Sequence, residues 1–158
     1  MNIDKTKALT LIQLANYLDE GGSSLYEYDY QKYLELDKFT SCIKDTLTYQ
    51  RKRQFIKLLR RLSTNRISVT GFIYGFEKLS LASDQDYATT RQDFEKLIIL
   101  QINQEAVGFQ KDIISNIYLA CEQFRYQVSE LDPDWLSELD FRTFMDDLLF
   151  EIQVYQYN

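Results

Sequence analysis

Glycine and proline are scarce in this chain, and their scarcity restricts the folds that it can adopt. The 158 residues include 5 glycines and one proline. All-β sandwiches and barrels use both residue types in their many turns, so this composition favours helices. Apolar residues make up 45% and charged residues 27% of the chain, as in a folded domain rather than a disordered segment. The composition therefore predicts an all-α protein with one sizeable core.

Apolar residues recur every three or four positions along most of the chain, which is the spacing of one helix face. The expected helices cover residues 4–19, 38–62, 69–79, 83–101, 110–126 and 133–155. The polar stretch 48–54 leaves open whether 38–62 is one helix or two, and residues 26–34 are expected to be a loop that runs into a helix. The predicted fold is a single all-α domain over residues 1–158, an antiparallel helical bundle of five to seven helices.

Glycine and capping residues set the expected helix ends. Gly21 and Gly22 form a C-cap, and a turn follows at Ser63-Thr64-Asn65. Small polar residues are expected at three helix N-caps, the last with proline at the first helical position, namely Asp37, Ser68 and Asp132-Pro133. Gly71 and Gly75 predict a close approach between helices, and Gly108 predicts a helix break.

The side chains that most catalytic and metal sites require are missing. The chain has no histidine, which excludes Ser-His-Asp and Cys-His nucleophilic sites and His-ligated zinc. It also has no glycine-rich phosphate loop and no HExxH pattern. Cys42 and Cys121 are 79 positions apart and each lies among apolar residues, so we expect two buried core thiols. We predict a protein that is not an enzyme, with no catalytic residues, no metal and no cofactor.

The net charge of −6 is unevenly distributed along the sequence. Eight basic residues and one acid lie between Lys44 and Arg66, whereas nine acids and two basic residues lie between Glu122 and Glu151. Within the basic segment, one helix side is expected to carry Arg53, Lys57, Arg60 and Arg61. That side is either a phosphate-binding surface or a solvated face that pairs with the acidic helices of the same fold.

Carboxylates and tyrosines could form a surface for a basic protein. Asp140, Asp147 and Glu151 share one helix side, which is expected to be a solvated face rather than a Mg²⁺ or acid–base site. The 12 tyrosines, several of them beside acids, either complete the core or form a protein-binding surface. The densest acidic feature is a short stretch with one tryptophan, comprising Glu130, Asp132, Asp134 and Trp135. It either caps a helix start or anchors a basic partner.

Three segments resemble the colicin D-type immunity proteins. They are the run Ile67–Phe76, the run Ala120–Phe124 with the acidic turn after it, and the closing helix Leu139–Ile152. The resemblance covers residues 56–152 and leaves 1–55 as a helical N-terminal extension. It implies a small acidic helical bundle that occupies the basic active site of a tRNA-cleaving toxin. The positions that match the acidic stretch of the family are Glu122, Glu130, Asp132 and Asp134.

These features predict a non-enzymatic acidic protein that binds and inhibits a basic protein, with an immunity protein against a nuclease toxin as the leading hypothesis. One alternative is a phage-type inhibitor that mimics nucleic acid and blocks a host nuclease complex. Another is a nucleic-acid-binding module that uses the basic segment 51–61, although the acidic remainder opposes direct binding of nucleic acid. No long apolar stretch and no signal-peptide core occur, so we expect a cytoplasmic protein without membrane contact.

Overall fold

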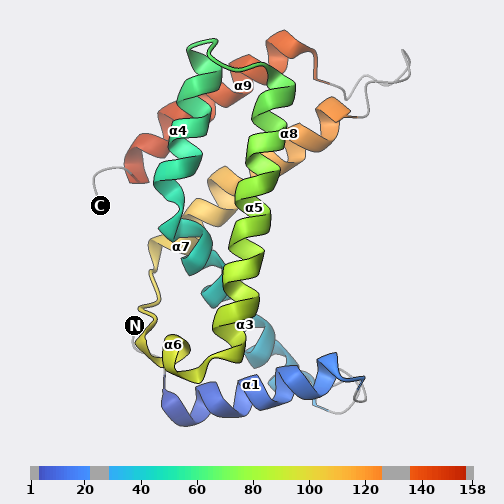
Figure 1. Cartoon of the computed structure of the whole chain (residues 1–158), viewed down its shortest axis with the longest axis vertical. Helices are drawn as coiled ribbons and strands as arrows, with labels where there is room; N and C mark the ends of the chain where they lie inside the picture. The colour runs from blue at the N-terminus through green and yellow to red at the C-terminus, as the bar shows by residue number, and fades with distance from the viewer. Residues whose placement is uncertain (1–3, 22–28, 126–135, 156–158) are drawn as a thin grey trace.

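The computed structural model describes residues 4–21, 29–125 and 136–155. All regular secondary structure in these ranges is helical, which confirms the all-α prediction (Figure 1). The helices are α1 (Lys5–Asp19), α3 (Tyr30–Gln50), α4 (Lys52–Ser63), α5 (Val69–Gln92), α6 (Phe94–Ile99), α7 (Glu105–Phe109), α8 (Ser115–Arg125) and α9 (Glu138–Glu151). A π-helical turn, Gln110–Ile114, joins α7 to α8, and a 3-10 turn, Ile152–Tyr155, follows α9.

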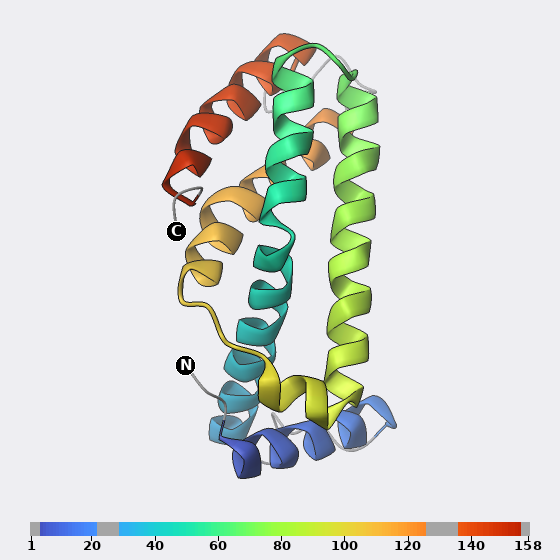
Figure 2. The same cartoon turned by 60° about the vertical axis from the view of Figure 1, so that its left-hand side comes forward.

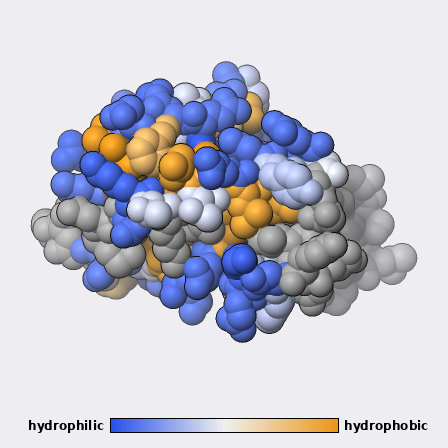
Figure 3. Space-filling model, turned by 90° about the horizontal axis from the view of Figure 1, so that it is seen from below, coloured by the Kyte–Doolittle hydropathy of each residue, from blue (hydrophilic) through white to orange (hydrophobic). Residues whose placement is uncertain are grey.

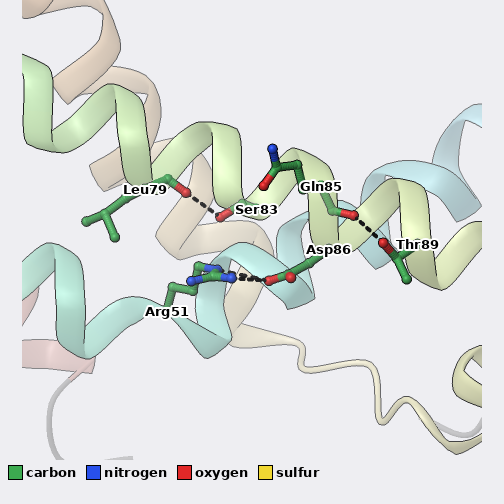
Figure 4. Close-up of polar contacts among 6 residues, drawn as sticks. All are labelled: Arg51, Leu79, Ser83, Gln85, Asp86 and Thr89. Atoms are coloured by element: carbon green, nitrogen blue, oxygen red, sulfur yellow. Dashed lines mark hydrogen bonds and ion pairs between the residues drawn. The ribbon is translucent and has the colours of Figure 1, made fainter.

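Helices α3 and α4 follow one another and pack along the full length of α5 (Figure 1). They are two helices and not one, because the chain turns at Arg51 before α4 begins. The Arg51 guanidinium donates to one carboxylate oxygen of Asp86 on α5, at 2.6 and 2.9 Å, and so holds this turn against α5 (Figure 4).

The start of α3 differs from the expected one. Asp29 accepts the backbone N–H of Lys32 at 3.1 Å and caps the helix at Tyr30, so Asp37 lies inside α3 and the prediction of a cap at Asp37 is wrong. The reason is a tertiary contact: Leu36 is buried against Ala15 of α1, and this packing stabilises the first turns of α3.

Helix α5 continues through the polar stretch where a new helix was expected at residue 83, so the predicted helix 83–101 is wrong. The hydroxyl groups in this stretch donate to backbone carbonyls four residues earlier, Ser83 to Leu79 at 3.1 Å and Thr89 to Gln85 at 2.9 Å (Figure 4). The hydrogen-bonding capacity of these hydroxyl groups is therefore met within the helix, and α5 can continue through the polar stretch. The break comes at Asp93, which caps α6 by accepting the Lys96 N–H.

Other helix ends are confirmed in part. Ser68 caps α5, and Asn65 has a φ of 54° in the predicted turn. A Cβ at Gly75 would come within 2.8 Å of Leu58 Cδ1, so α4 and α5 do approach closely there. The break near Gly108 is the non-helical stretch 100–104, and Gly108 itself lies in α7, where a Cβ would come within 2.9 Å of the Tyr155 hydroxyl.

The last helix begins later than expected. Ser137 caps α9 through a reciprocal pair with Asp140, so the helix starts at Glu138 and not at Pro133. The expected cap at Asp132-Pro133 lies outside the described residues. The local reason for the later start is that Ser137 and Asp140 satisfy both the first-turn N–H and the cap N–H of a helix that begins at Glu138.

The buried side chains form a large core and two smaller clusters. The large core joins α4, α5, α7, α8 and α9 around the wholly buried rings of Phe55, Phe72, Phe109 and Phe141. The larger of the other clusters joins α1, the second half of α3, and α6, through Ala8, Ile12, Ile43, Leu47 and Leu97. Helix α3 belongs to both, since Tyr49 packs edge-to-face on Phe109 at 5.5 Å. Residues of the expected N-terminal extension 1–55 thus pack in the same core as later residues. The division of the chain at residue 55 stays a prediction.

The cysteines differ in burial. Cys121 is a core residue as predicted, and burial raises the pKa of its thiol to about 12. Cys42 is only half-buried, so the prediction of a buried core thiol is wrong for this residue. Within the described ranges, no helix is both long enough and apolar enough to span a membrane.

Candidate functional site

Helix α4 places the four predicted basic residues on one outer face. Its inner face, formed by Phe55, Leu58, Leu59 and Leu62, is buried in the large core. Because helical residues three and four positions apart share a side, the intervening positions point outward. The exposed side chains there are Arg53, Lys57, Arg60 and Arg61, which we call the basic face.

Only part of the basic segment is neutralised within the described fold. Lys44 pairs with Asp84 at 2.8 Å, and Arg51 pairs with Asp86, so α5 supplies two of the acidic partners that the sequence suggested. Arg53, Lys57 and Arg61 make no ion pair with any residue that the structure describes. Among the described residues, the pairing hypothesis therefore holds for Lys44 and Arg51 and finds no support at Arg53, Lys57 and Arg61.

Helix α9 presents an acidic outer face, which we define by Asp140, Asp146, Asp147 and Glu151, all exposed. Its inner face buries Phe141, Met145 and Leu148. Two large apolar side chains also point outward, Leu139 with 73% and Phe150 with 74% of its surface exposed. Exposed apolar residues beside charges are typical of protein-binding surfaces more than of plain solvated faces.

Helical periodicity identifies three of these carboxylates in the sequence, whereas the exposed Leu139 and Phe150 were not predicted. Of these two, Leu139 could have been found. The signal that would have found it is its phase: it lies two positions before the buried Phe141, on the opposite side of a helix with 3.6 residues per turn.

The two charged faces lie on antiparallel helices that pack against each other. Near the end of α4, Arg142 Nη1 of α9 donates to the Leu62 carbonyl at 3.1 Å. Near the start of α4, Lys52 Nζ donates to the Tyr155 carbonyl, just after α9, at 2.8 Å. The two helices cross at an angle (Figure 2). Since Arg142 is the α9 residue that reaches α4, the helical spacing places Asp140, Asp147 and Glu151 on the side of α9 away from α4, and the two charged faces are separate surfaces.

Of the other predicted binding residues, the structure describes only Glu122, which is half-buried on α8 and has an interaction partner. Glu130, Asp132, Asp134 and Trp135 lie outside the described residues. Five exposed tyrosines are spread over α1, α3, α5 and α8, namely Tyr17, Tyr30, Tyr33, Tyr74 and Tyr118. Tyr49 is buried and belongs to the core, as one of the two hypotheses expects, whereas a binding role for the exposed tyrosines stays a prediction.

A polar cluster joins the α3–α4 junction to the end of the chain. Tyr49 donates its hydroxyl proton to Glu105 and accepts from Lys52 Nζ at 2.7 Å. Burial, together with the adjacent Glu105 carboxylate, raises the pKa of Tyr49 to about 12. The Tyr155 hydroxyl donates to Asp112 at 3.2 Å. This arrangement positions the start of α4 and the end of α9, and its high tyrosine pKa suits a structural hydrogen bond and not a base at neutral pH.

Two grooves open beside these elements. One, of about 340 Å³, lies between α3, α5 and the π-helical turn and includes Thr48, Ser80 and Tyr118 in its walls. The other, of about 450 Å³, lies at the α3–α4 junction beside Lys52, Arg53 and Asn103. Among the described residues, no group of three or more Cys, Asp or Glu side chains could hold a metal ion.

The opposite end of the molecule is different. Seen from below in Figure 3, it is a mixture of hydrophilic residues and scattered apolar ones. Leu9 of α1 and Ile99 of α6 are exposed in this part of the fold. No continuous charged stripe comparable to those of α4 and α9 is formed by the described residues of α1 and α6.

Comparison with protein-family models, with curated proteins and with solved structures returns no match for this chain. The candidate site is therefore defined by its own geometry: two antiparallel helices with buried apolar inner faces and outer faces of opposite charge.

Proposed function

We propose that this protein binds a basic protein partner through the acidic face of α9 and inhibits it. The observation that carries the proposal is the combination of four exposed carboxylates with the exposed side chains of Leu139 and Phe150 on one helix side. Carboxylates steer a basic partner toward the surface, and apolar side chains at its two ends add contact area once solvent is excluded.

The partner class that fits this chemistry is a nuclease, because a nuclease cleft is lined with Arg and Lys to hold phosphates. Occlusion of that cleft by α9 would be inhibition of the immunity type, in the cytoplasm, as the resemblance to colicin D-type immunity proteins implies. The stretch Glu130–Trp135 joins α8 to α9 in the sequence and extends the negative charge beyond α9. A phage-type inhibitor of a host nuclease complex would use the same face, and the identity of the captured partner distinguishes the two.

A second candidate function is supported by the basic face of α4. Its side chains are exposed, and Arg53, Lys57 and Arg61 form no ion pair among the described residues, as a phosphate-binding helix requires. The acidic remainder of the chain repels the same phosphates, so we rank direct binding of nucleic acid below binding of a basic protein.

The proposal is tested by capture and inhibition together. The wild-type protein is immobilised, proteins of the source cell are passed over it, and the captured partner is purified and tested for nuclease activity. We expect stoichiometric inhibition of that nuclease by the wild type. The variant Asp146→Lys/Asp147→Lys should inhibit at least about 100-fold more weakly, since charge pairs across such interfaces are worth about 1.5–7 kcal/mol.

The matched control is Glu20→Lys/Asp37→Lys, which makes the same change in charge at exposed positions of the opposite end. Lysine is a better helix former than aspartate, so Asp37→Lys does not disturb α3. The proposal is wrong if the captured basic protein has no nuclease activity that the wild type inhibits, or if both double variants inhibit equally.

A further inference from the structure

The groove at the α3–α4 junction is lined by cationic, amide and hydroxyl side chains and, among the described residues, by no carboxylate. It has a volume of about 450 Å³ and lies between this junction and the non-helical stretch 100–104. Its cations are Lys52 and Arg53, and its amides are Gln50, Gln101 and Asn103. An anion that enters this groove therefore meets two cations, although the chain as a whole has a net charge of −6.

The first cation, Lys52, is held in place with one N–H group to spare. Its Nζ donates to the Tyr49 hydroxyl at 2.7 Å and to the Tyr155 carbonyl at 2.8 Å. An ammonium group has three N–H groups, and the third has no acceptor among the described residues. The Glu105 carboxylate bonds to the Tyr49 hydroxyl and is not part of the groove lining, so it offsets the charge of Lys52 only in part.

The second cation, Arg53, has no internal counter-ion in the described fold. Its side chain is exposed and makes no ion pair with a described residue, whereas the nearby Arg51 is paired with Asp86. A guanidinium presents a planar fork of N–H groups that matches two oxygens of a phosphate, and an ammonium adds a point charge. A phosphate monoester with two negative charges therefore matches this pair of cations better than a carboxylate with one.

The opposite wall of the groove is fixed by hydrogen bonds to the rest of the fold. The Asn103 N–H donates to the Thr46 hydroxyl of α3 at 3.4 Å, and Asn103 Oδ1 accepts the Glu105 N–H at 2.9 Å. Gln50 and Gln101 are exposed beside it, and their amides can bond to hydroxyl groups of a ligand. Small-molecule sites have volumes of about 300–1,000 Å³, so the groove has room for an organic group as well as a phosphate.

We propose that this groove binds a small organic phosphate, with the phosphate group between Lys52 and Arg53 and the organic part along Gln50 and Gln101. A groove that holds one phosphate group does not supply the several phosphate contacts that a duplex needs for stable binding. The inference does not rest on the proposed function, because the groove is separate from the acidic face of α9.

The test is a titration of the full chain followed by the NMR signals of its backbone amides, in about 50 mM salt, where surface charges are weakly screened. The phosphorylated probes are AMP and glucose 6-phosphate, and the matched compounds without phosphate are adenosine and glucose. We expect both phosphorylated probes to cause saturable shifts at the start of α4 and in the stretch 100–104, with a Kd below about 1 mM. Adenosine and glucose should cause none.

Two variants test the groove itself. Arg53→Gln removes the cation without a counter-ion, and Gln101→Glu places a carboxylate in the lining. Each should weaken both phosphorylated probes at least about tenfold, because charge-assisted hydrogen bonds are lost or opposed. The matched controls Arg61→Gln and Gln31→Glu make the same changes in charge at exposed positions outside the groove lining, and they should keep the affinity of the wild type. Circular dichroism should show the same helicity for all four variants.

Three results would each overturn the inference. One is the absence of saturable shifts with both phosphorylated probes up to about 10 mM, which is too weak for a built site. Another is binding of adenosine or glucose as tight as that of its phosphate. The third is an equal loss of affinity in the groove variants and in their controls, which would mean that the probes respond only to overall charge.

Discussion

Helices α4 and α9 have similar inner faces and opposite outer ones. Each buries an aromatic ring with almost no exposed surface, Phe55 on α4 and Phe141 on α9, and each ring contacts two further rings of the core. The outer positions carry Arg and Lys on α4 and Asp and Glu on α9. Stability and recognition are thus separated on each helix: the inner residues determine the packing, and the outer residues determine which molecules can approach.

The largest expected effect is on the shared inner faces. Phe55→Ala and Phe141→Ala should each lower the free energy of unfolding by about 3–5 kcal/mol, because each removes a fully buried ring and leaves a cavity. Urea denaturation measures the loss. The similarity of α4 and α9 would be disproved by a difference of more than about 2 kcal/mol between the two variants, which would mean that one helix is peripheral to the core.

A smaller effect is expected where the start of α4 meets the end of α9. Tyr49→Phe removes the hydroxyl that donates to Glu105 and accepts from Lys52, and should cost about 1–3 kcal/mol, since it removes two part-buried hydrogen bonds to charged groups. Thermal denaturation at neutral pH measures this cost. An unchanged midpoint would show that the cluster does not stabilise the junction.

The same tyrosine predicts a dependence on alkaline pH. The pKa of Tyr49 is raised from about 10 in the unfolded chain to about 12 in the fold, so the native state favours the neutral phenol. The contribution of Tyr49 to stability is fully present below pH 10 and is lost as the pH rises toward 12. In urea titrations between these values, wild type should lose more stability than Tyr49→Phe, and equal losses would contradict the assigned cause.

Much of the difference between the two helices could be predicted from the sequence. The spacing of Phe55, Leu58, Leu59 and Leu62 fixed the inner side of α4, and with it the outward direction of the basic residues. The same reasoning found the carboxylates of α9. Helical periodicity is a local property, so it is sufficient where one side of a helix is apolar and the other is charged.

Features that depend on contacts distant in sequence could not be predicted. The ion pair that ties the α3–α4 turn to α5 joins Arg51 to Asp86, 35 positions apart. The early start of α3 depends on α1, and the continuity of α5 depends on hydroxyls that bond within the helix. The packing of α9 against α4 likewise joins segments distant in sequence, which no local pattern specifies.

The smallest effect is expected on nucleic-acid binding when the basic face of α4 is neutralised. The isolated protein should not retain duplex DNA or structured RNA at physiological salt, because the chain has a net charge of −6 and its acidic remainder repels phosphates. Gel-shift assays with the wild type and with Arg53→Ala/Lys57→Ala/Arg60→Ala/Arg61→Ala should look alike. A salt-sensitive complex of sub-micromolar affinity that this fourfold variant loses would favour the nucleic-acid-binding module.

The measurement that tests the role of the two faces most directly is the affinity of the captured basic partner for two variants of opposite design. By isothermal titration, Asp146→Lys/Asp147→Lys should bind at least about 100-fold more weakly than the wild type, which corresponds to about 2.7 kcal/mol. Lys57→Glu/Arg61→Glu should bind as tightly as the wild type or more tightly, since it removes positive charge beside a positive partner. Equal weakening by both variants, or weakening by the α4 variant alone, would contradict the assignment of partner binding to α9.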